Sequence, residues 1–152
     1  MIIRKAKLSD VRNIQELVNY YAGKDEMLPR SLSMLYESIR DFSVAISDSG
    51  ELIGCCAGGV CWEDMAEIKS LAVKEECKGQ GIGRMLVEKS IEGLKELGVT
   101  KVFTLTYSVG FFEKLGFNVV EKKKLPQKIW TECVYCPKFP DCGEEAMLFQ
   151  IP

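Results

Sequence analysis

The sequence contains no histidine among its 152 residues. Histidine is the usual general base near neutral pH and the commonest nitrogen ligand of zinc, so both roles must fall to other groups. A catalytic acid or base in this chain is therefore restricted to a carboxylate, a tyrosine, a cysteine, a lysine, water or the backbone.

Long apolar runs and a strong charge of either sign are also lacking. No apolar run approaches the roughly 20 residues that cross a bilayer, and the N-terminal MIIRKAKLSD has no apolar signal region. Twenty basic and 22 acidic side chains give an isoelectric point near 5.4, which offers no electrostatic case for nucleic acid. We therefore expect no membrane and no nucleic-acid partner, and a cytoplasmic location. With 47% hydrophobic residues, 1–152 is expected to be a single globular domain.

Cysteine, in contrast, is frequent: there are seven, an odd number that cannot all pair within one molecule. Cys133, Cys136 and Cys142 form a CxxCx5C pattern in a cysteine-rich C-terminal segment at about 130–143. CxxC is typical of metal-ligand pairs, but a tetrahedral site needs a fourth ligand. That ligand would have to come from the other cysteines, Cys55, Cys56, Cys61 or Cys77. Reduced structural thiols are the favoured interpretation, and no metal is predicted.

Hydrophobic periodicity predicts an α/β chain. Helical spacing covers residues 11–22, 32–39, 82–97 and, more briefly, 110–115. Strand-like runs cover residues 2–6, 42–47, 51–61, 65–73, 99–107 and 117–121, and a last apolar segment at 146–151 can add an edge strand. The order is one strand, two helices, an antiparallel meander and then βαβαβ. This order predicts a mixed sheet with helices on its faces.

The stretch KGQGIGR, residues 78–84, places three glycines between a strand and a helix. A dinucleotide fingerprint GxGxxG fails, because the glycine that would complete it is missing. A P-loop fails as well, because Arg84 and Met85 stand where lysine and serine or threonine are required. What remains is a glycine turn that leads into a helix N-terminus, whose N–H groups and positive dipole end favour a pyrophosphate. The alternative is a tight connection with no ligand.

The segment SLAVKEECKGQGIGRMLVE, followed by FFEKLGF, resembles the GNAT superfamily of N-acetyltransferases, which bind acetyl-CoA. The family's loop, Q/R-x-x-G-x-G/A, begins here with Lys78 in place of glutamine or arginine. The resemblance implies a mixed, largely antiparallel and twisted sheet of six to seven strands flanked by about four helices. It also implies a set of backbone groups for the cofactor. Leu71, Ala72 and Val73 would meet the pantetheine arm and the acetyl carbonyl, and the pyrophosphate would be held by Gly79, Gln80, Gly81, Ile82, Gly83 and Arg84.

Acetyl transfer to an amine requires a deprotonated amine, a polarised thioester carbonyl and a proton for the leaving thiolate. Glu67, which shares a strand face with Lys69, is the candidate base, acting directly or through a water. The alternative for Glu67 is an ordinary surface carboxylate. At the position where many GNAT enzymes carry tyrosine, Phe112 cannot donate a proton. Tyr107 is therefore the candidate acid, with Ser108, water or a purely packing role for Tyr107 as alternatives.

The segment MLPRSLSMLYESIRDFSVAI resembles the acetyltransferase domain of bacterial N-acetylglutamate synthases. The resemblance implies that Arg30 contacts the glutamate carboxylate, which suits a bidentate guanidinium, and that Ser108 lies near the substrate. Asp64 stands where these enzymes are expected to carry a lysine that selects the side chain of glutamate. This position therefore argues against glutamate as the acceptor.

The acceptor implied is the α-amine of a small amino acid, most of all L-glutamate, as in arginine biosynthesis. The expected partner is thus a small molecule, the amino-acid substrate. A homodimer is compatible with the sequence. Two alternatives remain: transfer to another amino acid or amine, and a module that binds CoA without chemistry or senses a metal or the redox state.

Overall fold

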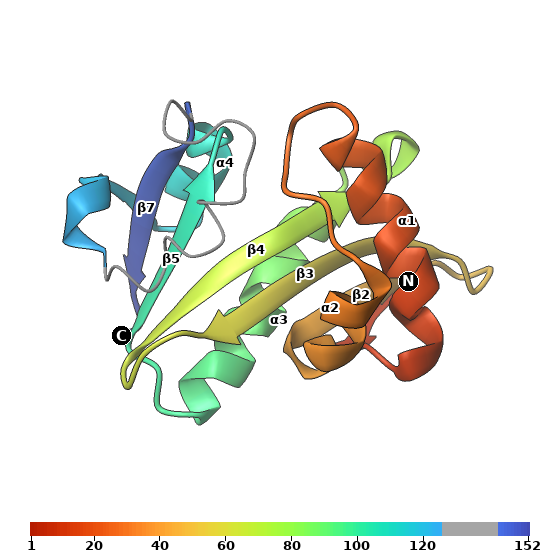
Figure 1. The fold of residues 1–152 in the computed structure, drawn as a ribbon, viewed down its shortest axis with the longest axis horizontal. Helices are drawn as coiled ribbons and strands as arrows, with labels where there is room; N and C mark the ends of the chain where they lie inside the picture. Colours follow the sequence, from red (N-terminus) through yellow and green to blue (C-terminus); the bar gives the residue numbers. More distant parts are fainter. Residues whose placement is uncertain (126–142) are drawn as a thin grey trace.

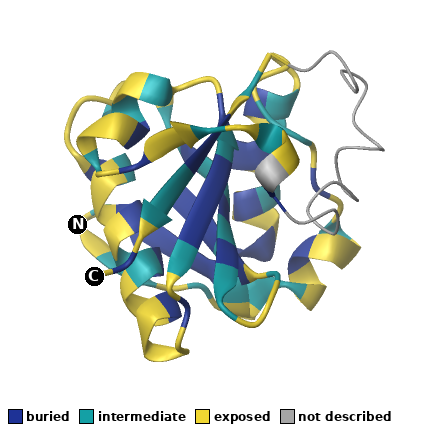
Figure 2. Cartoon of the chain, turned by 90° about the vertical axis from the view of Figure 1, so that its left-hand side faces the viewer, coloured by how far each residue is buried: buried dark blue, intermediate teal, exposed yellow. Residues whose placement is uncertain are grey.

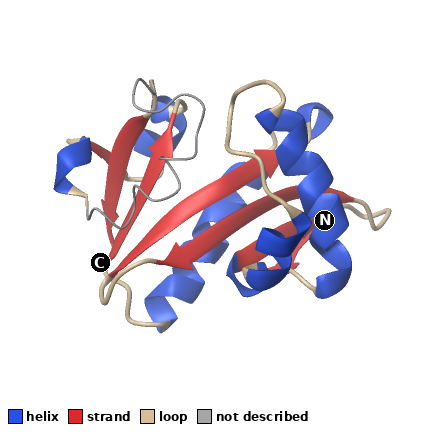
Figure 3. Cartoon of the chain, in the orientation of Figure 1, coloured by secondary structure: helices blue, strands red, loops and turns tan. Residues whose placement is uncertain are grey.

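In the computed structural model, which describes residues 1–125 and 143–152, a seven-stranded sheet is covered by helices on both faces (Figures 1 and 3). The strand order is β1-β2-β3-β4-β5-β7-β6. The strands are β1 (Ile2–Lys5), β2 (Phe42–Ile46), β3 (Leu52–Val60), β4 (Met65–Val73), β5 (Lys101–Thr106), β6 (Asn118–Val120) and β7 (Glu145–Gln150). All neighbours are antiparallel except β4 and β5. The expected mixed, largely antiparallel sheet is confirmed.

The α-helices of the described residues are α1 (Val11–Ala22), α2 (Leu32–Glu37), α3 (Ile82–Glu96) and α4 (Val109–Lys114). Short 3-10 turns are η1 (Leu8–Asp10), η2 (Ile39–Asp41), η3 (Glu75–Cys77) and η4 (Lys122–Lys124). In the part of the chain that the structure describes, no helix combines the length and the apolar character that crossing a membrane requires.

Of three clusters of buried apolar residues in the described part of the chain, the two larger ones lie on the two faces of the sheet, and buried residues run along its central strands (Figure 2). The core under α1 and α2 includes Val11, Val18, Leu35, Val44 and Ala57. The core under α3 and α4 includes Ile68, Leu86, Val87, Phe112 and Phe117. Gly54 brings α3 close to β3, because a Cβ at this position would lie 3.0 Å from Leu86 Cδ1. This packing places the N-terminus of α3 next to the end of β4.

The last strand, β7, is not an edge strand. It pairs with β5 on one side and with β6 on the other, so the expectation of an edge at residues 146–151 was wrong. The physical reason is burial: Ala146 and Met147 are fully buried, whereas Val119 of the three-residue β6 is 51% exposed. The short, exposed strand takes the edge, where its unpaired backbone groups can be solvated.

The start of α1 is fixed by an ion pair and not by a side-chain cap. Asp10 occupies the N-cap position but makes no capping bond. Its carboxylate accepts hydrogen bonds from the Arg4 guanidinium at 2.8 and 3.1 Å and from the Lys7 N–H at 2.7 Å. Burial favours the neutral acid, but the bonds from Arg4 and Lys7 outweigh it and lower the pKa of Asp10. The pair ties β1 to α1.

Asp10→Asn should lower the free energy of unfolding by about 2 kcal/mol at pH 7, since hydrogen bonds to a buried charge are lost. The folded pKa of Asp10 is depressed, so this stabilisation is complete above the unfolded pKa and disappears as the pH falls through the folded value. Urea unfolding at pH 7 and below pH 3 checks both statements. Asp48→Asn is the control, because Asp48 meets the Met1 amine at 95% exposure and should contribute little. An equal loss in the free energy of unfolding for both variants would contradict the stabilising role assigned to Asp10.

Candidate active site

The two parallel strands at the centre of the sheet separate part-way along their length (Figure 1). Their pairing ends where Glu67 lies opposite Phe103. Just beyond this point, the Thr104 hydroxyl donates to the Ile68 carbonyl at 2.9 Å, so a side chain satisfies that carbonyl. Among the described residues, the remaining edge of β4, up to Val73, has no strand partner on its β5 side. Glu67 therefore lies at the closed end of the divergence between β4 and β5.

A β-bulge distorts β4 beside this edge. Between the pairs that Lys69 and Ala72 form with β3, β4 has one more residue than β3. Ser70 has a φ of +54°, a left-handed value that is uncommon for serine. The extra residue shifts the alternation of side chains. Lys69 lies opposite a residue of the core under α1 and α2, and Glu67 shares that face, whereas Leu71 packs against the core under α3.

Arg30 lies between α1 and α2, and its guanidinium reaches the bulge. Its Nε donates to the Ser70 hydroxyl at 3.3 Å, and only 8% of the residue is exposed. The Arg30 backbone is held by α1: its N–H donates to Asn19 Oδ1 at 3.0 Å, and its carbonyl accepts from the Asn19 and Gln15 amides at 3.3 Å. The next residue, Ser31, caps α2 by accepting from the Met34 N–H at 3.1 Å. Arg30 is thus a rigidly placed cation on the same face as Glu67.

The glycine loop leads from η3 into α3 with an open helix N-terminus. Gly79 and Gly81 have φ values of +83° and +80°, which disfavour any side chain. Gly81 is the N-cap and makes no side-chain cap. The Met85 N–H donates to the Gly81 carbonyl at 3.1 Å, so the N–H groups of residues 82–84 precede the first helical bond. These N–H groups and the helix dipole suit an anion.

The first turn of α3 packs between the end of β4 and α4. A Cβ on Gly83 would lie 3.3 Å from Phe111 Cζ and 3.9 Å from Val73 Cγ2, so glycine permits the close approach. The strand edge and the loop N–H groups are therefore adjacent. The Arg84 side chain points to solvent and pairs with Glu88 at 2.6 Å, which leaves the backbone of Arg84 as its contribution to an anion site.

Tyr107 and Ser108 lie at the open end of the divergence, directly after β5. Tyr107 is 46% exposed, and a Cβ on Gly143 would lie 3.5 Å from its ring. Ser108 is the N-cap of α4, and its N–H donates to the Thr106 hydroxyl at 2.8 Å. Glu67 and Tyr107 thus occupy opposite ends of the divergence. Glu67 lies opposite Phe103, and Tyr107 follows Phe103 by four positions, about 13 Å of strand.

A model of the "Acetyltransferase (GNAT) family" matches residues 8–117, which is most of the chain. The chain belongs to the GNAT acetyltransferase family. Acetyl-CoA is accordingly its acetyl donor. The resemblance seen in the sequence is confirmed.

Two curated proteins are similar to this chain over most of its length. The acetyltransferase is 47% identical over 146 residues to an uncharacterized N-acetyltransferase of Chlorobaculum tepidum, with 96% of this chain and 94% of the relative covered. It is 35% identical to the amino-acid acetyltransferase of Mycobacterium tuberculosis over 133 residues, 86% of this chain and 76% of the relative.

Among solved structures, N-acetylglutamate synthase from Neisseria gonorrhoeae, complexed with coenzyme A and N-acetyl-glutamate, superposes with a TM-score of 0.88 at 26% identity. The match covers 99% of this chain and 35% of that chain. A Mycobacterium tuberculosis protein in complex with CoA gives a TM-score of 0.86 at 32% identity, with both chains fully covered.

Phe112 of the acetyltransferase is a core residue. It is 4% exposed, and its ring packs edge-on against Phe111 at 5.0 Å and Phe117 at 5.1 Å between centroids. The substitution of phenylalanine for the tyrosine common in the family therefore provides packing and no proton donor.

The cysteines give no support for a metal site within the described residues. Cys55 and Cys56 are fully buried in β3, and desolvation raises the pKa of the Cys56 thiol to about 12. No group of three or more metal-ligating side chains occurs in residues 1–125 and 143–152. Cys133, Cys136 and Cys142 lie outside the described residues.

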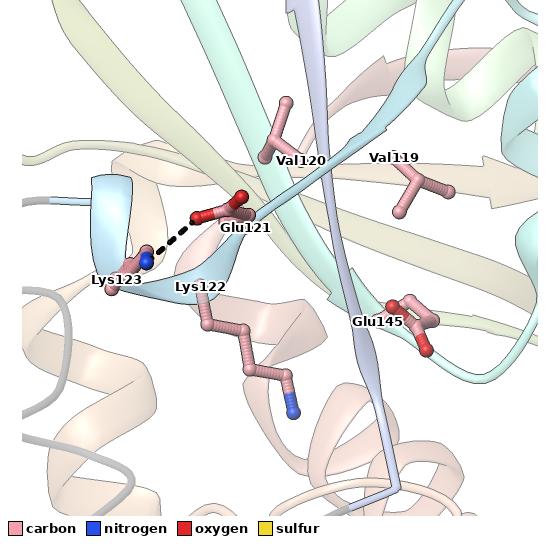
Figure 4. Close-up of a pocket in the computed structure, with 6 residues that line it drawn as sticks. All are labelled: Val119, Val120, Glu121, Lys122, Lys123 and Glu145. Atoms are coloured by element: carbon pink, nitrogen blue, oxygen red, sulfur yellow. Dashed lines mark ion pairs between the residues drawn. The ribbon is translucent and has the colours of Figure 1, made fainter.

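A surface hollow at the far edge of the sheet does not coincide with the site (Figure 4). It is lined by Val119, Val120, Glu121, Lys122, Lys123 and Glu145. Glu121 and Lys123 form an ion pair at 3.2 Å. None of the residues predicted for the cofactor, the acceptor or the proton transfers lines this hollow.

Sequence reasoning missed the side chains of α1 and the bulge that organise the site. Asn19 and Gln15 hold Arg30, Ser70 receives its guanidinium, and the Tyr21 hydroxyl donates to the Val73 carbonyl. The helical period places Tyr21 on the buried face of α1, but it does not distinguish a packing tyrosine from one with a hydrogen-bonding partner on β4.

Proposed function

We propose that this acetyltransferase transfers the acetyl group of acetyl-CoA to the α-amine of a small acidic amino acid, with L-glutamate as the preferred acceptor. The observation that carries the proposal is the position of Arg30, a buried guanidinium beside the β4 bulge and on the same face as Glu67. A guanidinium binds a carboxylate in a bidentate manner, which fits an acceptor that carries one. The names of the relatives and the gonococcal structure support an amino-acid acceptor.

In the proposed reaction, Glu67 accepts a proton from the acceptor amine, directly or through a water. The amine nitrogen then attacks the thioester carbonyl carbon, and a backbone N–H in the stretch Leu71–Val73 stabilises the oxyanion. The attack forms the C–N bond, and collapse of the tetrahedral intermediate breaks the C–S bond. The CoA thiolate takes a proton from Tyr107, and the nitrogen gives its second proton through water to the Tyr107 phenolate, which leaves a neutral amide and restores the phenol. The pyrophosphate is held by the loop N–H groups from Gly79 to Arg84, and Ser108 adds a substrate contact.

Asp64 is the sequence feature that argued against glutamate and for another acceptor. Its position in the structure weakens that argument. Its carboxylate lies 3.7 Å from Lys101 Nζ, and its carbonyl accepts from the N–H groups of Thr100 and Lys101. Ser70 follows Asp64 by six positions, about 20 Å of strand, so Asp64 is not beside Arg30. The departure from the lysine of the N-acetylglutamate synthases thus falls away from the bulge.

An acceptor panel tests the proposal. With acetyl-CoA and free-thiol detection, L-glutamate should give the highest kcat/KM among L-glutamate, L-aspartate, L-glutamine and a polyamine. The rate without any acceptor serves as the control for thioester hydrolysis. A higher kcat/KM for the polyamine would overturn the amino-acid assignment, and one for L-aspartate or L-glutamine would overturn glutamate alone.

A further inference from the structure

Tyr21, near the C-terminal end of α1, reaches across to the last residue of β4. Its hydroxyl donates to the Val73 carbonyl, and only 3% of the residue is exposed. Burial raises the pKa of the Tyr21 phenol, so the hydroxyl stays protonated and remains a donor at neutral pH. Neither the proton transfers nor the acceptor contacts proposed above use this residue.

The Val73 carbonyl points toward the cofactor side of β4. Val73 lies opposite Gly54 of β3, and the Lys74 N–H donates to the Ile53 carbonyl at 2.9 Å. In an antiparallel ladder, a bond between these flanking residues means that the N–H and C=O of Val73 itself point away from β3. They point to the side where β5 has diverged. Tyr21 thus fixes a peptide group on the edge that meets the pantetheine arm.

The ring of Tyr21 also contacts the segment that enters the glycine loop. Lys78 Nζ lies 4.6 Å from the ring centroid and 3.6 Å from a Glu75 carboxylate oxygen. The other oxygen of Glu75 lies 3.4 Å from Lys24 Nζ, one turn after Tyr20. The start and the end of residues 75–78 are therefore attached to the end of α1, and residue 78 is followed directly by Gly79.

We infer that Tyr21 is a positioning residue for acetyl-CoA. One side chain orients the last peptide group of β4 through its hydroxyl and the entry to the glycine loop through its ring. A single cofactor must meet the strand edge with its pantetheine arm and the loop with its pyrophosphate, so the two surfaces must keep a fixed relation. Tyr21 maintains that relation before the cofactor binds, which lowers the cost of ordering the site on binding.

Tyr21→Phe tests the inference, because it keeps the ring over which Lys78 lies and removes the hydroxyl that donates to the Val73 carbonyl and interacts with Lys78. The dissociation constant of acetyl-CoA, measured by calorimetry without an acceptor, should rise about 3- to 10-fold, the range expected for one hydrogen bond. In steady-state assays the acceptor KM should change less than twofold. The binding measurement does not involve the acceptor, so it is independent of the glutamate assignment.

Tyr36→Phe is the control: it removes a tyrosine hydroxyl from α2, on a side chain that is 43% exposed, and should leave acetyl-CoA binding unchanged. Thermal unfolding of both variants distinguishes a role in packing from a role in positioning acetyl-CoA. If Tyr21→Phe lowers Tm but leaves the acetyl-CoA dissociation constant unchanged, Tyr21 is a packing residue and the inference is wrong. Tighter binding would also overturn it, because the hydroxyl would then compete with the cofactor for the Val73 carbonyl.

Discussion

Arg30→Ala lowers kcat/KM for the amino-acid acceptor by about 100-fold or more, and it leaves the KM for acetyl-CoA within twofold of the parent value. The size follows from the loss of two charge-assisted hydrogen bonds to a carboxylate, each worth roughly 1.5–3 kcal/mol. The effect on the cofactor is small because Arg30 lies on the face of the sheet opposite α3. Initial rates at varied acceptor and varied acetyl-CoA give both constants.

Two comparisons make the Arg30 result specific. Arg30→Lys keeps the charge but not the planar fork, so it should recover only part of the lost activity. Arg40→Ala removes an exposed arginine in η2 and should change neither constant. An acceptor whose carboxylates are replaced by amides should respond little to the loss of Arg30. If that neutral acceptor loses as much activity as the acid, Arg30 supports the fold and does not bind the carboxylate.

The repeating elements could be predicted from the sequence because their patterns are local. The helical spacing over residues 11–22 corresponds to α1, whose buried positions recur at intervals of three and four: Val11, Ile14, Leu17, Val18 and Tyr21. Gly98, just past α3, has a φ of +95°, as expected for a glycine that ends a helix. The glycine loop could also be predicted from the sequence, because the positive φ at Gly79 and Gly81 is a backbone conformation that selects glycine.

Features that depend on tertiary packing could not be predicted. The bulge at Ser70 places a non-glycine residue at positive φ, and one serine within the strand-like run EIKSLAV does not indicate a bulge. The position of β7 between β5 and β6 depends on which strand is long and buried enough for the interior of the sheet. The support of Arg30 by Asn19 depends on the path of residues 23–31, which no periodic pattern describes.

Glu67→Gln lowers kcat by about 100-fold or more, within the range that a positioned general base contributes. The amide is nearly isosteric with the carboxylate but cannot accept the proton of the amine. Glu67 stands where β4 and β5 separate, on the face that carries Arg30, so it is the carboxylate of β4 nearest to the bulge. Because a higher pH increases the fraction of free amine, the deficit of the variant should shrink as the pH rises. Rates measured from pH 6 to 10 test this.

The matched control is Glu63→Gln, which makes the same change at an exposed residue before β4 begins and should keep kcat within twofold. Binding of acetyl-CoA should be unaffected in both variants, since the loop N–H groups are untouched. A Glu67→Gln enzyme with nearly full kcat would exclude Glu67 as the base. A deficit that is constant with pH would instead indicate that Glu67 orients the acceptor, because a positioning defect does not depend on the protonation of the amine.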